Sequence, residues 1–255
     1  MRSGDFSNLA LDYVNNRPGY SDNVLNALIK YVKADQDDFR VADVGAGTGI
    51  WTKMLVDQGL DCFAVEPNTE MLEQGVAYTN KSSVQWQHGS AEDTRIDTSS
   101  INWVTMASSF HWVVVEEALR EFARVLKPRG FLTVLWNPRD IEGNPLHEEI
   151  ENLIYRMVPN LSRVSSGSNK HARDYHKELT CTGEFSDIIF FESKHEIIMT
   201  KERYLGVWRS VNDIQSQAGP EIFQQLLANI ADIIQSMDQI VVPYKTRAWT
   251  AQKID

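Results

Sequence analysis

The chain has 255 residues, enough for one large domain or for one domain that carries an insertion. Hydrophobic residues make up 42% of it and charged residues 24%, which is ordinary for a globular protein with a sizeable core. The 35 acidic residues outnumber the 25 Lys and Arg residues, so the formal charge is -10. This acidic excess argues against a protein whose main partner is a phosphate backbone.

Cysteine content and hydropathy bear on the cellular setting. The only two cysteines, Cys62 and Cys181, are too few for a disulfide framework or a thiolate metal cluster. The first residues lack the apolar stretch of a signal peptide, and no apolar run approaches the roughly 20 residues of a membrane span. We therefore expect a cytoplasmic protein that is not embedded in a membrane.

Between Arg40 and Trp136, short apolar segments typical of strands alternate with segments of helical spacing. The helical spacing is clearest at residues 115–126, and Lys127-Pro128-Arg129-Gly130 is expected to close that helix. Such alternation implies right-handed crossovers and a parallel sheet covered by helices on both faces. The five predicted strands are 41–44, 61–65, 84–88, 101–106 and 131–136.

Beyond Trp136 the pattern changes. A helix is expected over 146–157, and the polar stretch 160–177 is interpreted as a surface loop. Two strands (188–191 and 196–199), a helix around 204–208, a long helix opened by Pro220, and the segments 241–244 and 247–251 complete the chain. The expected fold class is α/β, a Rossmann-like sheet of seven strands, mostly parallel, with an antiparallel final strand.

A glycine-rich loop follows the first predicted strand, with the sequence Gly45-Ala46-Gly47-Thr48-Gly49. Glycines let the backbone turn sharply and approach a ligand, and the following helix presents free N–H groups. A dinucleotide fingerprint has the spacing G-x-G-x-x-G, but here Ile50 occupies the place of the third glycine. Together with the preceding Asp43, this departure favours a ligand with a carboxylate and an amine over a pyrophosphate.

Glu66 ends the second predicted strand and is followed by Pro67. An acid at this place points into the crevice at the carboxyl ends of the strands, where it can accept both hydroxyls of a ribose. Taken alone, a glutamate at a strand end is more often a solvated loop charge. Its distance from the glycine loop makes the ribose role the preferred interpretation.

Further motifs follow the same strands. They are Gly89-Ser90-Ala91-Glu92-Asp93, Ala107-Ser108-Ser109-Phe110-His111-Trp112, the run Leu126–Leu132, Tyr13 with Arg17-Pro18-Gly19-Tyr20, and Pro243-Tyr244-Lys245-Thr246-Arg247. With the glycine loop and Glu66, they resemble the class I S-adenosylmethionine-dependent methyltransferases. The N-terminal segment (Tyr13 with Arg17–Tyr20) and the C-terminal segment (Pro243–Arg247) are similar to the small-molecule subgroup that includes the trans-aconitate methyltransferases.

The resemblance implies S-adenosylmethionine as the cofactor and S-adenosylhomocysteine as the product. The glycine loop would line the methionine part, Asp43 would brace that loop, and Glu66 would hold the ribose. Many relatives have Asp where this chain has Ser90, so the contact to the adenine amino group is expected to be weaker here. The implied cofactor-binding residues are Tyr20, Asp43, Gly45, Ala46, Gly47, Gly49, Glu66, Pro67, Ser90, Ala91, Glu92, Ser108 and His111.

The resemblance also suggests where the methyl acceptor binds. Arg17, Arg139 and Arg209 would together hold an acidic acceptor, although each alone is more often a solvated charge. His111 is either a general base or a wall of the cofactor pocket, and the wall is the preferred interpretation. The candidate substrate-binding residues are Arg17, Trp112, Trp136, Arg139, Trp208 and Arg209.

We expect a single methyltransferase domain over 1–255, in which three segments contribute to binding. Residues 1–38 form a cofactor cover and first helix, 137–185 an insertion or lid region, and 201–236 a helical lid segment. The expected partners are a small-molecule substrate for O- or N-methylation, without nucleic acid or membrane, in a monomer or homodimer. No metal site is expected, because His171, Asp174 and His176 lack a fourth ligand.

Three alternative functions remain. An NAD-dependent oxidoreductase of Rossmann type is disfavoured by the misplaced third glycine. A nucleic-acid or protein methyltransferase is disfavoured by the negative charge and by Ser108-Ser109-Phe110-His111, which replaces the Asn/Asp-Pro-Pro-aromatic run of base-amine methylases. A protein that only senses the cofactor is not excluded by the sequence.

Overall fold

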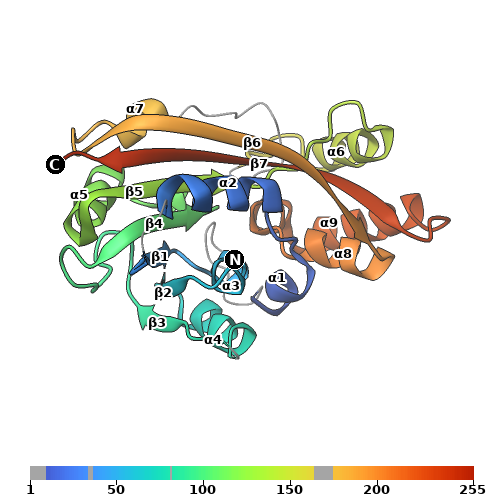
Figure 1. Cartoon of the computed structure of the whole chain (residues 1–255). Coiled ribbons are helices and arrows are strands. Elements are labelled where there is room, and N and C mark those ends of the chain that lie inside the picture. Colours follow the sequence, from blue (N-terminus) through green and yellow to red (C-terminus); the bar gives the residue numbers. More distant parts are fainter. Residues whose placement is uncertain (1–9, 34–36, 81, 164–174) are drawn as a thin grey trace. The chain divides into compact units, whose positions relative to one another are not determined.

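The computed structural model describes residues 10–33, 37–80, 82–163 and 175–255. Seven strands form one sheet in the order β3-β2-β1-β4-β5-β7-β6 (Figure 1). They are β1 (Arg40–Val44), β2 (Asp61–Glu66), β3 (Gln85–His88), β4 (Ile101–Ala107), β5 (Leu126–Trp136), β6 (Phe185–Met199) and β7 (Ile240–Lys253). Strands β1 to β5 pair in parallel, whereas β7 runs antiparallel to β5. The predicted fold class is therefore confirmed.

Helices separate most of the strands, as the alternation of patterns predicts. None of the described helices is long and apolar enough to cross a membrane. The described helices are α1 (Ala10–Asn16), α2 (Asp22–Lys33), α3 (Ile50–Asp57), α4 (Thr69–Tyr78), the 3₁₀ turn η2 (Phe110–Trp112), α5 (Val115–Val125), α6 (Pro145–Met157), α7 (His176–Leu179), α8 (Lys201–Arg209) and α9 (Asn212–Ile233).

The chain divides into two compact units. Unit 1 comprises residues 1–18, 138–170 and 194–245, and unit 2 comprises 19–137, 171–193 and 246–255. Unit 2 holds strands β1 to β5, whereas unit 1 holds α6, α8 and α9. Both β6 and β7 contribute residues to each unit.

Unit 2 has a hydrophobic cluster on each face of its sheet. Successive side chains of a strand point to opposite faces, and in β1 Val41 belongs to one cluster while Ala42 and Val44 belong to the other. Helix α5 packs into the cluster of Ala42 and Val44, and helices α2 and α3 pack into that of Val41. Because helices cover both faces, β1 and β4 are buried along almost their whole length.

Unit 1 has its own core, built from the apolar faces of α6, α8 and α9 with the adjoining ends of β6 and β7. Helix α9 is kinked at Gly219, whose φ of 75° and ψ of 165° are not helical. The helical segment after the kink begins at Pro220, which the sequence analysis expects, because a proline lacks an N–H group that the first turn does not need.

The structure corrects three predicted elements. Strand β6 runs unbroken through 185–199, where two strands were expected, and β7 likewise runs through 240–253. The polar stretch 192–195 shows no apolar alternation, yet its side chains continue the alternating exposure of β6. The third correction concerns β5, which begins at Leu126, so residues 127–130 belong to the strand and do not close α5. Of the expected surface loop at 160–177, residues 164–174 lie outside the described residues.

Candidate functional site

The glycine loop lies at the carboxyl end of β1, where the strand order reverses, because β1 has β2 on one side and β4 on the other. Open α/β sheets bind ligands in the crevice at such a switch point. The backbone N–H groups of Gly45 and Ala46 both donate to the carbonyl of Val65, at 2.8 and 3.1 Å. These bonds hold the loop against the end of β2, directly beside Glu66.

Gly45 and Gly47 serve different purposes in this loop. Both have a positive φ, 67° and 58°, which a residue with a Cβ rarely adopts. A Cβ on Gly45 would lie 2.8 Å from Cβ and Oγ of Ser109, so that position must be glycine for packing. A Cβ on Gly47 would meet nothing within 4 Å. The loop is therefore open at Gly47.

Glu66 is 6% exposed, and both oxygens of its carboxylate accept backbone hydrogen bonds. Gly47 N donates to Oε2 at 2.8 Å, and Asn68 N donates to Oε1 at 2.9 Å. Burial raises the pKa of Glu66, and the backbone hydrogen bonds from Asn68 and Gly47 oppose this shift. A carboxylate has about four acceptor positions, so the two oxygens can still accept two more hydrogen bonds.

Asp43 lies in β1 just before the loop and is completely buried. Its Oδ2 accepts a hydrogen bond from Thr52 Oγ1 at 2.5 Å, and its Oδ1 accepts one from Thr105 Oγ1 at 3.2 Å. Burial raises the pKa of Asp43 to about 7, and the charge of Glu66 adds to the rise. Asp43 thus joins β1 to α3 and β4 as a brace beneath the loop.

The segment after β3 is the one to which the resemblance assigns the adenine. Ser90 Oγ accepts hydrogen bonds from the backbone N–H groups of Glu92 and Asp93, at 3.3 and 3.2 Å. Both lone pairs of that hydroxyl are then engaged, so it offers a ligand its hydrogen and no acceptor. Ala91 is buried, and Glu92 Oε1 accepts from Val114 N at 2.9 Å. An adenine amino group needs another acceptor here.

Tyr20 lies beside the ends of two further elements of unit 2. Its hydroxyl shares a hydrogen bond of 2.9 Å with Ser108 Oγ, and its ring contacts Trp51 of α3 edge-on, with 5.2 Å between ring centroids. Ser108 follows β4 with a φ of 58°, which is strained for a residue with a side chain. Pro67, the remaining residue of the predicted cofactor set, is exposed directly after Glu66.

Three aromatic candidates meet where β4 and β5 end. The indole Nε1 of Trp136 donates a hydrogen bond to Nδ1 of His111 at 3.3 Å. The ring of Trp112 lies 4.7 Å from that of His111 and is 44% exposed. Tyr175, which the sequence analysis does not single out, stacks on Trp136 with 4.1 Å between centroids and an interplanar angle of 9°.

Arg139 belongs to unit 1, together with Trp208. Its guanidinium carbon lies 3.7 Å from the centroid of the Trp208 ring, and Arg139 is only 7% exposed. Within the described part of the chain, no carboxylate lies within 4 Å of its nitrogens. The neighbouring Asp140 is bound by Lys194 at 2.7 Å and Lys245 at 3.1 Å instead. A buried cation without an anion is costly and is the usual mark of an anion-binding position.

Two hydrogen bonds of His147 orient Tyr204, whose hydroxyl lies near Arg139. His147 Nε2 lies 3.0 Å from the carbonyl oxygen of Val241, which only accepts, so Nε2 carries the hydrogen. The other nitrogen, Nδ1, then accepts from the Tyr204 hydroxyl at 3.1 Å, and the positive charge of Arg139 near that hydroxyl opposes the rise in the pKa of Tyr204 that burial causes. Burial lowers the pKa of His147, and the charge of Arg139 lowers it further. The neutral His147 therefore orients Tyr204 beside the guanidinium.

The other predicted arginines of unit 1 have different surroundings. Burial raises the pKa of Tyr244, and the positive charges of Arg139, Arg17 and Arg203, which lie near its hydroxyl, oppose that rise. Arg17 Nε donates to Ser210 Oγ at 2.7 Å. Arg209 instead pairs with Asp12 at 3.5 Å, with both side chains over one third exposed. Arg203 is a member of this group that no sequence pattern indicates.

Comparison with known proteins identifies the central part of the chain. Residues 42–134 match the family model described as a methyltransferase domain. An uncharacterized methyltransferase of Mycobacterium tuberculosis (strain H37Rv) is 38% identical over 128 residues, and the match spans about half the length of each protein. An uncharacterized methyltransferase-like protein of Schizosaccharomyces pombe is 26% identical over 246 residues, which cover 95% of this chain and 93% of that protein.

Solved structures agree in fold. A putative type II methyltransferase from Anaeromyxobacter dehalogenans superposes with a TM-score of 0.66 at 16% identity, over 93% of this chain and 98% of that one. Phosphoethanolamine N-methyltransferase 2 of Haemonchus contortus, in complex with phosphomonomethylethanolamine and S-adenosylhomocysteine, gives a TM-score of 0.56 at 16% identity, covering 98% of this chain and 58% of that one. Residues 42–134 therefore match a methyltransferase domain, and the sheet that contains them has the Rossmann-like fold found in such enzymes.

The residues of this methyltransferase domain fit its cofactor. The open loop at Gly47 leaves room where a Cβ would stand, and the Glu66 carboxylate has acceptor positions left for two hydroxyls. Thr48 Oγ1 is buried and has no hydrogen-bond partner among the described residues. Such an orphaned hydroxyl fits a loop that completes its hydrogen bonds with a ligand. The sequence analysis does not include Thr48 among its candidates.

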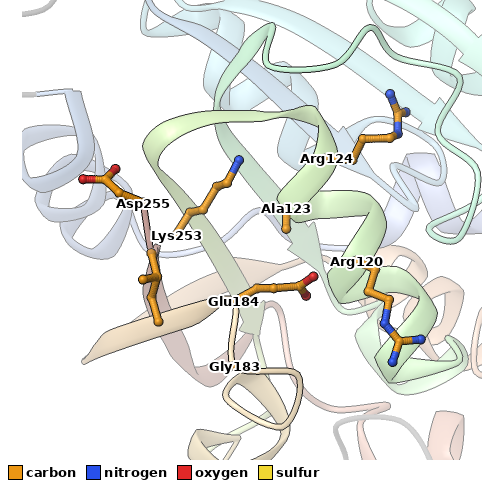
Figure 2. A pocket seen from close by; sticks show the side chains of 8 residues that line it. Arg120, Ala123, Arg124, Gly183, Glu184, Lys253 and Asp255 are labelled. Atoms are coloured by element: carbon orange, nitrogen blue, oxygen red, sulfur yellow. The ribbon is translucent and has the colours of Figure 1, made fainter.

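A cavity of about 470 Å³ in the methyltransferase domain lies away from these residues (Figure 2). It is lined by α5, the residues around the start of β6 and the end of β7, and by none of the predicted site residues. Its cations are already satisfied: Arg124 bonds to Glu121 at 2.7 Å, and Lys253 Nζ donates to the carbonyl of Leu126 at 2.9 Å. It lies near Leu126, where β5 begins, so it is not at the ligand-binding edge of the sheet.

The described residues contain no group of three or more His, Cys, Asp or Glu side chains arranged to hold a metal ion. Of the histidines and acids that the sequence analysis considers for a metal, His171 and Asp174 lie outside the described residues.

Proposed function

We propose that this protein transfers a methyl group from S-adenosylmethionine to a small-molecule acceptor that carries an anionic group. The observation that carries the proposal is the pairing of Gly47 with Glu66, in which an open loop donates to a buried carboxylate that can still accept two hydroxyls. When bound, the cofactor supplies a methyl group on a positively charged sulfur, ready for displacement. The domain's own residues then have to hold both molecules and exclude water.

The cofactor would be bound by residues of unit 2. Glu66 would accept the two ribose hydroxyls, and the open backbone at Gly47 would approach the methionine part. Asp43 would act from below, through Thr52 and Thr105, because its side chain is fully buried. The remaining assignments are Tyr20, Gly45, Ala46, Gly49, Pro67, Ser90, Ala91, Glu92, Ser108 and His111, as the resemblance implies.

The anionic group of the acceptor would be bound by Arg139. Its guanidinium is buried against Trp208, lacks a carboxylate partner among the described residues, and lies near the hydroxyl of Tyr204. A planar guanidinium suits a carboxylate or phosphate. Arg17 would contribute a further positive charge for binding the anionic group. The pairing of Arg209 with Asp12 favours a surface role for Arg209. Trp112 and Trp136 remain proposed walls for the acceptor.

A small acceptor agrees with two structures that share this fold. One is named phosphoethanolamine N-methyltransferase 2, and another, from Galdieria sulphuraria, is a putative sarcosine dimethylglycine methyltransferase. The membership of the trans-aconitate subgroup stays a prediction, and so do the lid roles of 1–38, 137–185 and 201–236.

The test is calorimetric titration of the full chain with S-adenosylmethionine, S-adenosylhomocysteine and NAD, followed by methyl transfer to a panel of acids, phenols and amines. We expect both sulfur nucleosides to bind, NAD not to bind, and the best acceptors to be anionic. Binding of NAD without binding of the sulfur nucleosides would overturn the proposal in favour of the oxidoreductase. If the cofactor binds but neutral acceptors are preferred, only the proposed role of Arg139 is overturned.

A further inference from the structure

The hydrogen bond between Trp136 and His111 fixes which imidazole nitrogen carries the hydrogen. The indole Nε1 of Trp136 lies 3.3 Å from Nδ1 of His111. An indole nitrogen donates and cannot accept. Nδ1 must therefore present its lone pair to the indole, and in a neutral imidazole the hydrogen then resides on Nε2.

This arrangement is incompatible with a role of His111 as a general base. A base must accept a proton, but the lone pair of Nδ1 is bound by Trp136 and Nε2 already has its hydrogen. Full protonation of the ring would place an Nδ1–H against the indole N–H, which are both donors. His111 in this geometry can only donate, through Nε2–H.

We propose that Trp136 is a positioning residue that holds His111 in the Nε2–H tautomer, and that His111 donates a hydrogen bond to the acceptor and does not remove its proton. The first half concerns two residues of unit 2 alone, and the second half rests on the proposed function. The proton balance follows directly: no proton passes to His111, so a proton on the nucleophile of the acceptor is either lost before binding or passes to another base or to water.

The surroundings of Trp136 keep its indole in place. Its ring stacks on Tyr175 and meets Trp249 edge-on, with 5.9 Å between centroids and an interplanar angle of 75°. Its backbone pairs with Arg247 of β7. His111 lies in the η2 turn, and its ring packs against that of Trp112, with 4.7 Å between centroids.

The decisive experiment is a two-bond ¹H–¹⁵N correlation spectrum of the imidazole rings at neutral pH, recorded on the full chain without cofactor. The signals of His111 are identified by their loss in His111→Asn. We expect an unprotonated Nδ1 and a protonated Nε2 in the wild type. In Trp136→Phe, which removes the indole N–H, both nitrogens should shift towards values averaged between the two tautomers.

Trp249→Phe is the matched control, because it alters the same aromatic cluster but leaves the bond to His111. Its His111 signals should resemble those of the wild type. A protonated Nδ1 in the wild type, or unchanged His111 signals in Trp136→Phe, would overturn the positioning role. The wild-type spectrum decides the tautomer by itself if Trp136→Phe does not fold.

A second readout tests the role in the reaction, once the screen described above has supplied an acceptor. His111→Gln keeps an N–H donor and should retain turnover within about tenfold, whereas His111→Leu should lose about ten- to hundredfold. If His111 were a base, both variants would lose roughly 10²–10⁴-fold alike. Failure of the wild type to bind S-adenosylmethionine would instead contradict the proposed function and leave the tautomer result standing.

Discussion

Two arginines of unit 1 are buried to the same degree but differ in their electrostatic surroundings. Arg163 and Arg139 are both 7% exposed. Arg163 is bound by Glu151 at 2.8 Å and by Asp213 at 3.3 Å. Arg139 stacks on Trp208 and has no carboxylate within 4 Å among the described residues. Since an arginine does not lose its proton in a protein, a buried guanidinium without a carboxylate partner among the described residues is suited to bind an anionic ligand.

The comparison extends to a third buried charge, Asp43 of unit 2, which is compensated in another way. It has no cationic partner among the described ion pairs, and its pKa of about 7 means that it takes up a proton instead. The three groups thus show three outcomes of burial: pairing within the chain, protonation, and exposure of a charge to a ligand. The first two indicate structural roles, and the third indicates binding.

The largest effect should follow from breaking the internal pair. Arg163→Met leaves Glu151 and Asp213 buried without their shared cation, which should lower the free energy of unfolding by about 3–5 kcal/mol. Arg139→Met should cost less than about 2 kcal/mol, mainly for the lost contact with Trp208. Urea unfolding of both variants measures the difference. Equal costs would show that the two arginines do not differ as described.

The second effect concerns pH. Because the folded-state pKa of Asp43 is about 7, against 3.8 for the ordinary side chain, the folded chain binds a proton that the unfolded chain releases between these values. Stability from this group is therefore greatest in acid and declines as the pH rises through 7. Between about pH 5 and pH 8 the wild type should lose roughly 3 kcal/mol relative to Asp43→Asn. Urea unfolding measures this difference. If the free energy of unfolding depended on pH in the same way in both proteins, the raised pKa of Asp43 would be refuted.

The third effect tests what Arg139 is for. Arg139→Met should weaken binding of an anionic acceptor by about 1.5–3 kcal/mol, the range for a hydrogen bond to a charged group, and leave the affinity for S-adenosylmethionine unchanged. The matched control is Arg156→Met, which changes an exposed arginine of α6. KM for the acceptor and calorimetry with the cofactor provide the two measurements. A parallel loss of both affinities would mean that Arg139 maintains the fold.

Sequence reasoning succeeded where the determinants are local. The β1 strand, the glycine loop and Glu66 follow one another within 27 residues, and burial on both faces makes most residues of such strands apolar. The single long strand β6 was missed, because its polar stretch 192–195 shows no apolar alternation.

Contacts between distant residues could not be predicted from the sequence. Nothing local distinguishes Arg163, which has two carboxylate partners, from Arg139, which has none in the part of the chain that the structure describes. The same holds for Trp136 and His111, which are 25 residues apart yet share the bond that determines the tautomer. The spacing of helical residues likewise shows only that Arg209 lies next to Trp208, and not that it pairs with Asp12.

The most direct test of the central claim is the affinity of Glu66→Ala for S-adenosylmethionine, measured by calorimetry beside the wild type and Glu70→Ala, an exposed neighbour in α4. Loss of the carboxylate would remove the two proposed hydrogen bonds to the ribose and the observed one from Gly47 N, so we expect the affinity to fall by about 2–3 kcal/mol, with Glu70→Ala unchanged. Equal affinity in Glu66→Ala and the wild type would contradict the account.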